Sequence, residues 1–147
     1  MKGLLMINLG SPDSTSIPDV KRYLDEFLMD KRVIGKSYLF RWILVKLIIL
    51  NIRPRKSAKA YKKIWWKEGS PLIVLSKRLF NKVTQLLDIP VALAMRYGSI
   101  SIKKGLNELN KKGVKDVLVL PLYPHYAMSS YETCLLYTSD AADDSLR

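Results

Sequence analysis

The segment 117-VLVLPLYPHYAMSS-130 joins an apolar run to a loop that is rich in proline, tyrosine and serine. Its first four residues are branched and apolar, which predicts a buried strand. Two prolines follow, and with them come flat aromatic rings and hydroxyl groups. Ligands of open α/β sheets bind at the carboxyl ends of the strands. The loop is therefore expected to form one wall of a site for a large planar ligand.

Strands and helices alternate along the rest of the chain. Two more apolar runs, 3–9 and 91–95, predict buried strands. Apolar spacing, together with capping serines, predicts helices over 16–29, 56–66 and 72–87, and a fourth that starts at Ser99 or Ser101 and ends at Lys112. This order is typical of an α/β domain with a mostly parallel, Rossmann-like sheet and right-handed crossovers.

The stretch 38–50 is strongly apolar and is interrupted only by Arg41 and Lys46. It is shorter than the roughly 20 residues that cross a bilayer. Two interpretations stay open at this point. The stretch is either a core helix or an exposed hydrophobic lip that lies on a membrane with Phe40 and Trp42 at the interface.

Composition bounds the class of protein. The 147 residues suffice for one domain with a core, and the net charge of +12 suggests either an anionic partner or a solvated basic surface. A single cysteine, Cys134, excludes a disulfide framework, and His125 is the only histidine, so we expect no metal site. No signal peptide is visible, which favours a cytoplasmic protein. We find no nucleic-acid motif, P-loop or G-x-G-x-x-G pattern. A nucleotide- or sugar-phosphate-binding function is therefore supported only by the general α/β topology.

The last residues, 134–147, differ from the rest of the chain. They contain three aspartates and no lysine, whereas the preceding sequence is rich in lysine. They resemble the in-frame translation of a sequencing adapter. We therefore expect a native domain over 1–133 and a non-native tail over 134–147.

Polar and aromatic residues follow each predicted strand. The segments expected to gather at one edge of the sheet are Asn8–Pro12, Arg53–Ser70, Arg96–Gly98 and Tyr123–Ser130. Arginine binds carboxylates with a planar fork, and tyrosine packs against a ring while keeping a hydroxyl group for hydrogen bonding. A slot for a flat ring that carries carboxylates is one interpretation. Surface ion pairs for the arginines, core packing for the tyrosines and a helix cap at Ser70 are the alternatives.

From about Lys2 to Thr133 the chain resembles the N-terminal half of ferrochelatases. Five segments carry the resemblance, in family order and spacing: Asn8–Pro12, Arg53-Pro54 with Tyr61, Ile64-Trp65 with Gly69–Leu72, Met95–Gly98, and Pro121–Pro124. The resemblance implies insertion of ferrous iron into a porphyrin in haem synthesis, with these two as substrates and partners and no tightly bound cofactor. It also implies that 38–50 belongs to the family's hydrophobic active-site lip, which favours the lip interpretation. Peripheral contact of this lip with the inner membrane stays open at this point.

The resemblance also implies a set of porphyrin-contacting positions: Leu9, Arg53, Tyr61, Ser70, Arg96, Tyr97, Tyr123 and Ser129. Leu9 offers an apolar face but no axial ligand. The family's catalytic histidine, in a Ser-Ala-His motif, and its glutamate partner have no counterpart here, and neither has the second, similar α/β half. We therefore expect no catalytic residue and an inactive fragment. The alternative is a basic α/β module that binds anionic lipid or nucleic acid.

Overall fold

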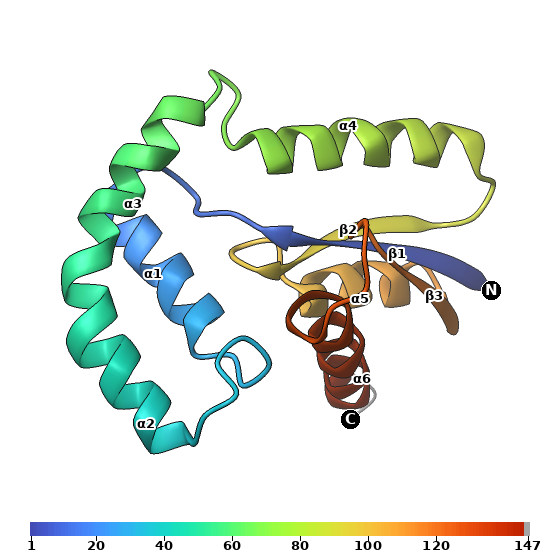
Figure 1. The fold of residues 1–147 in the computed structure, drawn as a ribbon. Coiled ribbons are helices and arrows are strands. Elements are labelled where there is room, and N and C mark those ends of the chain that lie inside the picture. Colours follow the sequence, from blue (N-terminus) through green and yellow to red (C-terminus); the bar gives the residue numbers. More distant parts are fainter. Residues whose placement is uncertain (146–147) are drawn as a thin grey trace. The chain divides into compact units, whose positions relative to one another are not determined.

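The computed structural model describes residues 1–145, with side chains described through residue 143. Its elements, in chain order, are β1 (Lys2–Gly10), α1 (Ile17–Leu28), α2 (Tyr38–Trp42), the π-helical η1 (Ile43–Ile49), α3 (Leu50–Ile64), α4 (Pro71–Leu86), β2 (Val91–Tyr97), α5 (Ile102–Lys111), β3 (Asp116–Pro121), the π-helical η2 (Met128–Glu132) and α6 (Thr133–Ser145) (Figure 1). The chain forms two compact units. We call residues 1–10 with the chain from Leu75 onward the sheet unit, and residues 11–74 the helical unit.

The sheet unit holds three parallel strands in the order β2-β1-β3. β1 is the central strand, and its Leu4 is in register with Val91 on one side and Leu118 on the other. A central parallel strand is covered on both faces, which explains why β1 is continuously apolar from Leu4 to Ile7. The predicted α/β class with a parallel sheet is confirmed.

Alternate residues of β1 supply two separate cores. Leu5 and Ile7 are fully buried in a cluster that includes Ile102 of α5 and Cys134 of α6. Leu4 and Met6 face the other way and pack with Phe80 and Val83 of α4 and with Val91. Figure 1 shows the result, with α4 on one face of the sheet and α5 and α6 on the other. Burial of each such side chain stabilises the folded state by about 1.5–3 kcal/mol.

The predicted helix starts are confirmed where a serine caps the helix. The side chain of Ser16 accepts a hydrogen bond from the backbone N–H of Asp19 and begins α1. Ser101 does the same for Lys104 at the start of α5. α5 ends just before Gly113, whose φ of 76° is the left-handed conformation that commonly follows a helix.

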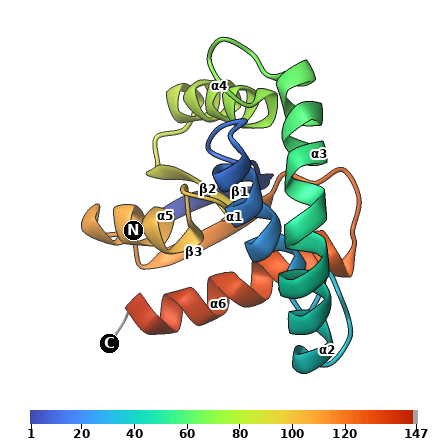
Figure 2. The same cartoon turned by 90° about the vertical axis from the view of Figure 1, so that its left-hand side faces the viewer.

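The helical unit packs α1 along α3, as Figure 2 shows. Val20, Leu24 and Leu28 of α1 are buried against Val45 of η1 and against α3. These α1 residues lie three or four positions apart, so the amphipathic pattern correctly predicted which side of the helix is buried. A half-buried ion pair between Lys46 and Asp25, at 2.5 Å, joins η1 to α1 beside this core.

The helix predicted over 56–66 forms but starts earlier, so the segment Arg53–Ser70 begins on a helix. α3 begins at Leu50, six residues before the predicted start at residue 56, and it continues to Ile64 with Pro54 inside it. Proline lacks an N–H and crowds the preceding turn, so it predicts a break. Here it lies in the turn that directly follows the wider π-helical η1, where the regular hydrogen-bond ladder is already altered.

Residues 38–50 have an inverted distribution of polar and apolar side chains. Arg41 is buried and donates to the carbonyl oxygens of Lys36, at 2.7 Å, and Ile34. Most of the large apolar side chains face outward instead: Tyr38, Leu39, Phe40, Trp42, Ile43, Leu47 and Ile48. The core-helix interpretation therefore holds for Val45, Ile49 and Leu50, whereas the seven side chains named above form an exposed apolar surface. Across the described residues, none of the helices has the length and apolarity needed to cross a membrane.

Candidate functional site

Three of the marker segments follow the three strands of the sheet unit. Because β1, β2 and β3 are parallel, their carboxyl ends lie at the same edge of the sheet. Gly10 and Tyr97 are register partners there. A Cβ added to Gly10 would lie 1.9 Å from the Tyr97 carbonyl oxygen, and its φ of 103° also requires glycine. The close approach of the two strand ends explains the glycine of the first marker.

Arg96 makes a hydrogen bond and two aromatic contacts at this edge. Its Nε donates to the Thr133 hydroxyl at 2.9 Å. Its guanidinium carbon lies 4.6 Å from the ring centre of Tyr97 and 4.4 Å from that of Tyr137. Contacts of a guanidinium with aromatic rings at such distances are attractive. Arg96 therefore contacts two rings, one of which belongs to the tail helix α6.

Tyr97 and Tyr123 also face inward. Tyr97 is only 1% exposed, so its ring serves as packing beneath Arg96 in this structure. Tyr123 is partly buried against the core, and its hydroxyl lies 3.4 Å from the Cys134 sulfur. Ser129 is half-buried in the π-helical turn η2. Residues of α6 thus touch both Arg96 and Tyr123.

Leu9 lies half-buried near the end of β1. Its backbone N–H donates to the Asn8 side-chain oxygen at 2.8 Å. The Asn8 amide nitrogen donates in turn to the hydroxyl of Ser76, at 3.0 Å. Asn8 therefore has a structural role, because it fastens the strand end to α4.

The other three predicted site residues lie in the helical unit. Arg53 is exposed on α3, and Ser70 is buried just before α4. Tyr61 is half-buried and meets Trp65 edge-to-face, with ring centres 6.1 Å apart. Burial raises the pKa of the Tyr61 hydroxyl, and the positive charge of Arg53 partly opposes this shift.

The structure thus divides the eight predicted residues between the two units. The sheet unit holds Leu9, Arg96, Tyr97, Tyr123 and Ser129. The helical unit holds Arg53, Tyr61 and Ser70. In the sheet unit, Arg96 and Tyr97 are in direct contact, and α6 contacts both Arg96 and Tyr123.

Sequence reasoning missed one candidate in the first marker. The hydroxyl oxygen of Ser11 is buried and has no hydrogen-bond partner within the described part of the chain. A buried hydroxyl without a partner costs free energy, so it is a candidate to contact a ligand. Its position inside Asn8–Pro12 was the available signal, but a serine in a turn predicts a hydrogen bond to the backbone instead.

The acidic and imidazole groups do not form a metal centre in residues 1–145. Within that range, no set of three or more histidine, cysteine, aspartate or glutamate side chains is placed to hold an ion. His125 is exposed in the loop after β3. The arrangement offers arginine and tyrosine side chains, which bind carboxylates and aromatic rings.

Comparison with known proteins gives a consistent set of relatives. The chain matches the family described as Ferrochelatase over residues 1–146. It is 51% identical over 144 residues to a ferrochelatase of Opitutus terrae, covering 96% of this chain and 42% of the relative. It is 53% identical over 131 residues to a ferrochelatase of Azotobacter vinelandii, covering 88% and 38%. A ferrochelatase of Coxiella burnetii is 49% identical over 135 residues, covering 90% and 38%. The chain therefore spans about two fifths of the length of these relatives.

Proposed function

Because the chain belongs to the ferrochelatase family, we propose that it is the N-terminal part of an enzyme that inserts ferrous iron into a porphyrin during haem biosynthesis. The substrates of the whole enzyme are then ferrous iron and the porphyrin. One observation carries the proposal. Three family markers follow three parallel strands and so meet at one edge of the sheet, where α/β proteins bind ligands.

The proposed role of the residues described here is to bind and orient the porphyrin. Arg96 is the candidate partner for a propionate at the sheet edge, and Arg53 is the candidate in the helical unit, because guanidinium groups bind carboxylates through two donors. Tyr61 and Tyr123 offer ring faces with hydroxyl groups, and Leu9 offers an apolar surface. Ser70 and Ser129 supply further hydroxyl groups, and Tyr97 supports Arg96 from below.

We further propose that the 147-residue chain does not insert metal. Removal of the two pyrrole protons needs a positioned base, and the Ser-Ala-His motif of the family does not occur in this sequence. The proposal also assigns 1–133 to the native domain and 134–147 to a non-native tail. In that case Tyr137 is foreign to the site, and its ring lies over the Arg96 guanidinium that is the candidate partner of a propionate.

The exposed apolar surface of 38–50 favours a second property. Phe40, Trp42 and their neighbours are suited to a peripheral contact with a membrane surface, and a net charge of +12 favours an anionic one. We propose a cytoplasmic protein that touches the inner membrane through this surface. Salt-dependent binding to anionic vesicles, lost when Phe40 and Trp42 are changed to serine, supports it. A basic lipid-binding module without porphyrin affinity is the alternative.

Porphyrin binding tests the proposed function directly. Titration of the chain with a porphyrin that carries propionates should quench the porphyrin fluorescence and saturate. Arg96→Ala should weaken the binding, whereas Lys115→Ala, an exposed change at the amino end of β3 and so at the opposite edge of the sheet, should not. Absence of saturable quenching, or equal binding by both variants, removes the sheet edge as the porphyrin site.

A further inference from the structure

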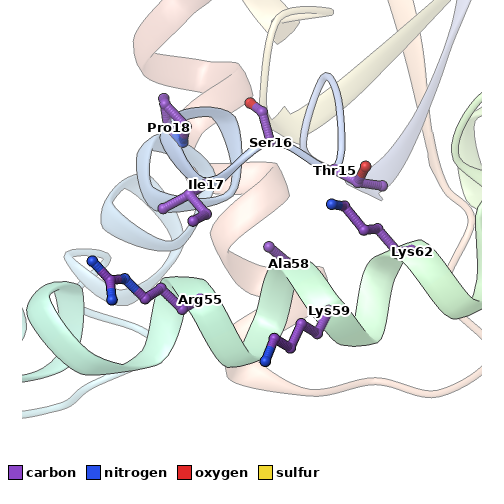
Figure 3. Close-up of a pocket in the computed structure, with 8 residues that line it drawn as sticks. All are labelled: Thr15, Ser16, Ile17, Pro18, Arg55, Ala58, Lys59 and Lys62. Atoms are coloured by element: carbon purple, nitrogen blue, oxygen red, sulfur yellow. The ribbon is translucent and has the colours of Figure 1, made fainter.

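The helical unit contains a concave pocket of about 590 Å³ that none of the predicted porphyrin contacts lines. Thr15, Ser16, Ile17 and Pro18 form one side, at the start of α1. Arg55, Ala58, Lys59 and Lys62 of α3 form the other, with the buried Ala58 as the floor (Figure 3). This volume falls within the range of small-molecule sites.

The charges of this pocket are all positive. Its three ionisable lining residues are Arg55, Lys59 and Lys62, and no carboxylate lines it. Their spacing on α3, of four and then three residues, places them along one side of the helix. In Figure 3 the Lys62 side chain extends toward Thr15 and Ser16, while Arg55 lies at the end of the pocket near Ile17.

The nearby acids do not neutralise these cations. Asp13 and Asp19 are both paired with Arg22, at 3.0 and 2.7 Å. Among the described residues, no ion pair joins an acid to Arg55, Lys59 or Lys62. Uncompensated cations around a concave surface attract anions and are relieved by binding them.

The other basic residues of α3 increase the electrostatic repulsion among these unpaired cations. The helix has six lysines and arginines and no acidic residue. Like charges three or four residues apart destabilise a helix by a few tenths of a kcal/mol per pair. The N-terminus of α1 does not supply the attraction for an anion, because Ser16 already caps it and Pro18 has no N–H. The positive charge therefore comes from side chains of α3.

We propose that this pocket binds a linear oligophosphate group, such as the diphosphate or triphosphate portion of a small molecule. The three charged side chains are spread along α3, so a single monovalent anion cannot meet all of them. Consecutive phosphates can reach Arg55 at one end and Lys62 at the other. Lysine and arginine both bind phosphate oxygens, and the Thr15 and Ser16 hydroxyls lie beside them as further donors.

Titration of the 147-residue chain with inorganic tripolyphosphate, at constant ionic strength, tests the site by calorimetry. We expect saturable binding near one ligand per chain and a higher melting temperature in its presence. Arg55→Gln and Lys62→Gln should each weaken the binding about tenfold. Lys56→Gln and Lys63→Gln are matched controls, because they remove the same charge from the same helix outside the pocket. They should change the affinity less than about twofold.

All four variants change exposed positions, so their melting curves should remain cooperative. Equal weakening by pocket and control variants, or no saturable binding, overturns the proposal in favour of diffuse attraction. A second arm uses phosphatidylcholine vesicles with and without phosphatidic acid. Suppose that the chain binds the acidic vesicles but not tripolyphosphate, and that the two pocket variants lose this binding. The phosphate would then belong to a lipid headgroup, which would overturn the proposal of a soluble ligand. Porphyrin quenching measured in the same variants should be unchanged, which separates this site from the proposed function.

Discussion

At the residue scale, Arg53 shows how solvent exposure limits the free energy that one side chain contributes to ligand binding. It lies exposed on α3, near enough to Tyr61 for its charge to oppose the upward shift of the tyrosine pKa. A hydrogen bond between charged groups contributes about 1.5–3 kcal/mol when it is shielded from water. An exposed arginine should reach only the lower end of that range.

Arg53→Ala should weaken porphyrin binding about tenfold, and Arg53→Lys should weaken it less, because lysine keeps the charge and loses the two-point geometry. Fluorescence titration of the variants measures this difference. Lys56→Ala, an exposed change on the same helix, is the control. Porphyrin affinity equal to that of the unmodified chain in Arg53→Ala would remove Arg53 from the site.

Tyr23 sets a pH limit on the stability of the helical unit. Burial raises its pKa well above the usual value of 10.0, and the ionisation of Tyr61 and the charge of Glu26 raise it further. The unfolded chain releases this proton near pH 10, while the folded state retains it. The stabilisation is therefore complete below about pH 10, and the free energy of unfolding falls as the pH rises above that value.

Tyr23→Phe should reduce the decrease in the free energy of unfolding at alkaline pH. Denaturant unfolding at about pH 9 and about pH 11 should show a smaller decrease in the variant than in the unmodified chain. The exposed Tyr38 provides the control, since Tyr38→Phe should leave the decrease unchanged. An identical decrease in Tyr23→Phe would mean that Tyr23 ionises equally well in the folded and unfolded states.

At the scale of elements, α2 and η1 show why apolar content alone does not predict burial. The stretch 38–50 reads as a core helix by composition, yet Arg41 and Lys46 turn inward because backbone carbonyl groups and Asp25 satisfy them. The sequence periodicity does not distinguish this arrangement from one in which the apolar side chains face inward and the basic ones face solvent. Local signals performed better. Ser16 correctly predicted the start of α1, Ser101 was one of two serines predicted to start α5, and the α1 spacing correctly predicted its buried side.

Changing Phe40 and Trp42 to serine should raise the solubility of the chain and preserve its cooperative melt. The two side chains are 51% and 39% exposed, so they add apolar surface that promotes association. Val45→Ser is the contrasting change, because Val45 is fully buried and its loss should cost about 2–4 kcal/mol. Light scattering and thermal melts check both. Loss of the cooperative melt in the Phe40 and Trp42 variant would show that these residues are core.

The tail helix α6 affects the candidate site through Tyr137. Deleting the whole tail is a poor test, since Cys134 and Ala141 are buried in the core of the sheet unit. Tyr137→Ala instead removes one of the two rings on Arg96. A contact of this kind contributes about 0.5–1 kcal/mol, so porphyrin affinity should rise about two- to fivefold. Leu136→Ala, on the same helix, should have no effect. Unchanged affinity in Tyr137→Ala would show that α6 does not cover the binding surface of Arg96.

At the scale of the whole molecule, the α/β class, the parallel sheet and the family followed from the sequence because strand composition and marker order are local properties. The candidate site was only partly predictable for a physical reason. Arg96 was identified, but its contacts with Thr133 and Tyr137 come from an element whose packing no motif encodes. Arg53 was placed outside the helix predicted over 56–66, whereas α3 already begins at Leu50, directly after the π-helical η1, and includes Pro54.

We propose that this chain contains porphyrin-binding elements of a ferrochelatase and lacks the residues that insert the metal. The direct measurement is the rate at which the purified chain inserts zinc or ferrous iron into a porphyrin, with the Azotobacter vinelandii relative as the positive control. A positioned base typically contributes about 10²–10⁴-fold in rate. We predict saturable porphyrin binding and no turnover above the rate without protein. Clear turnover that disappears in His125→Ala would contradict the account and identify His125 as the base.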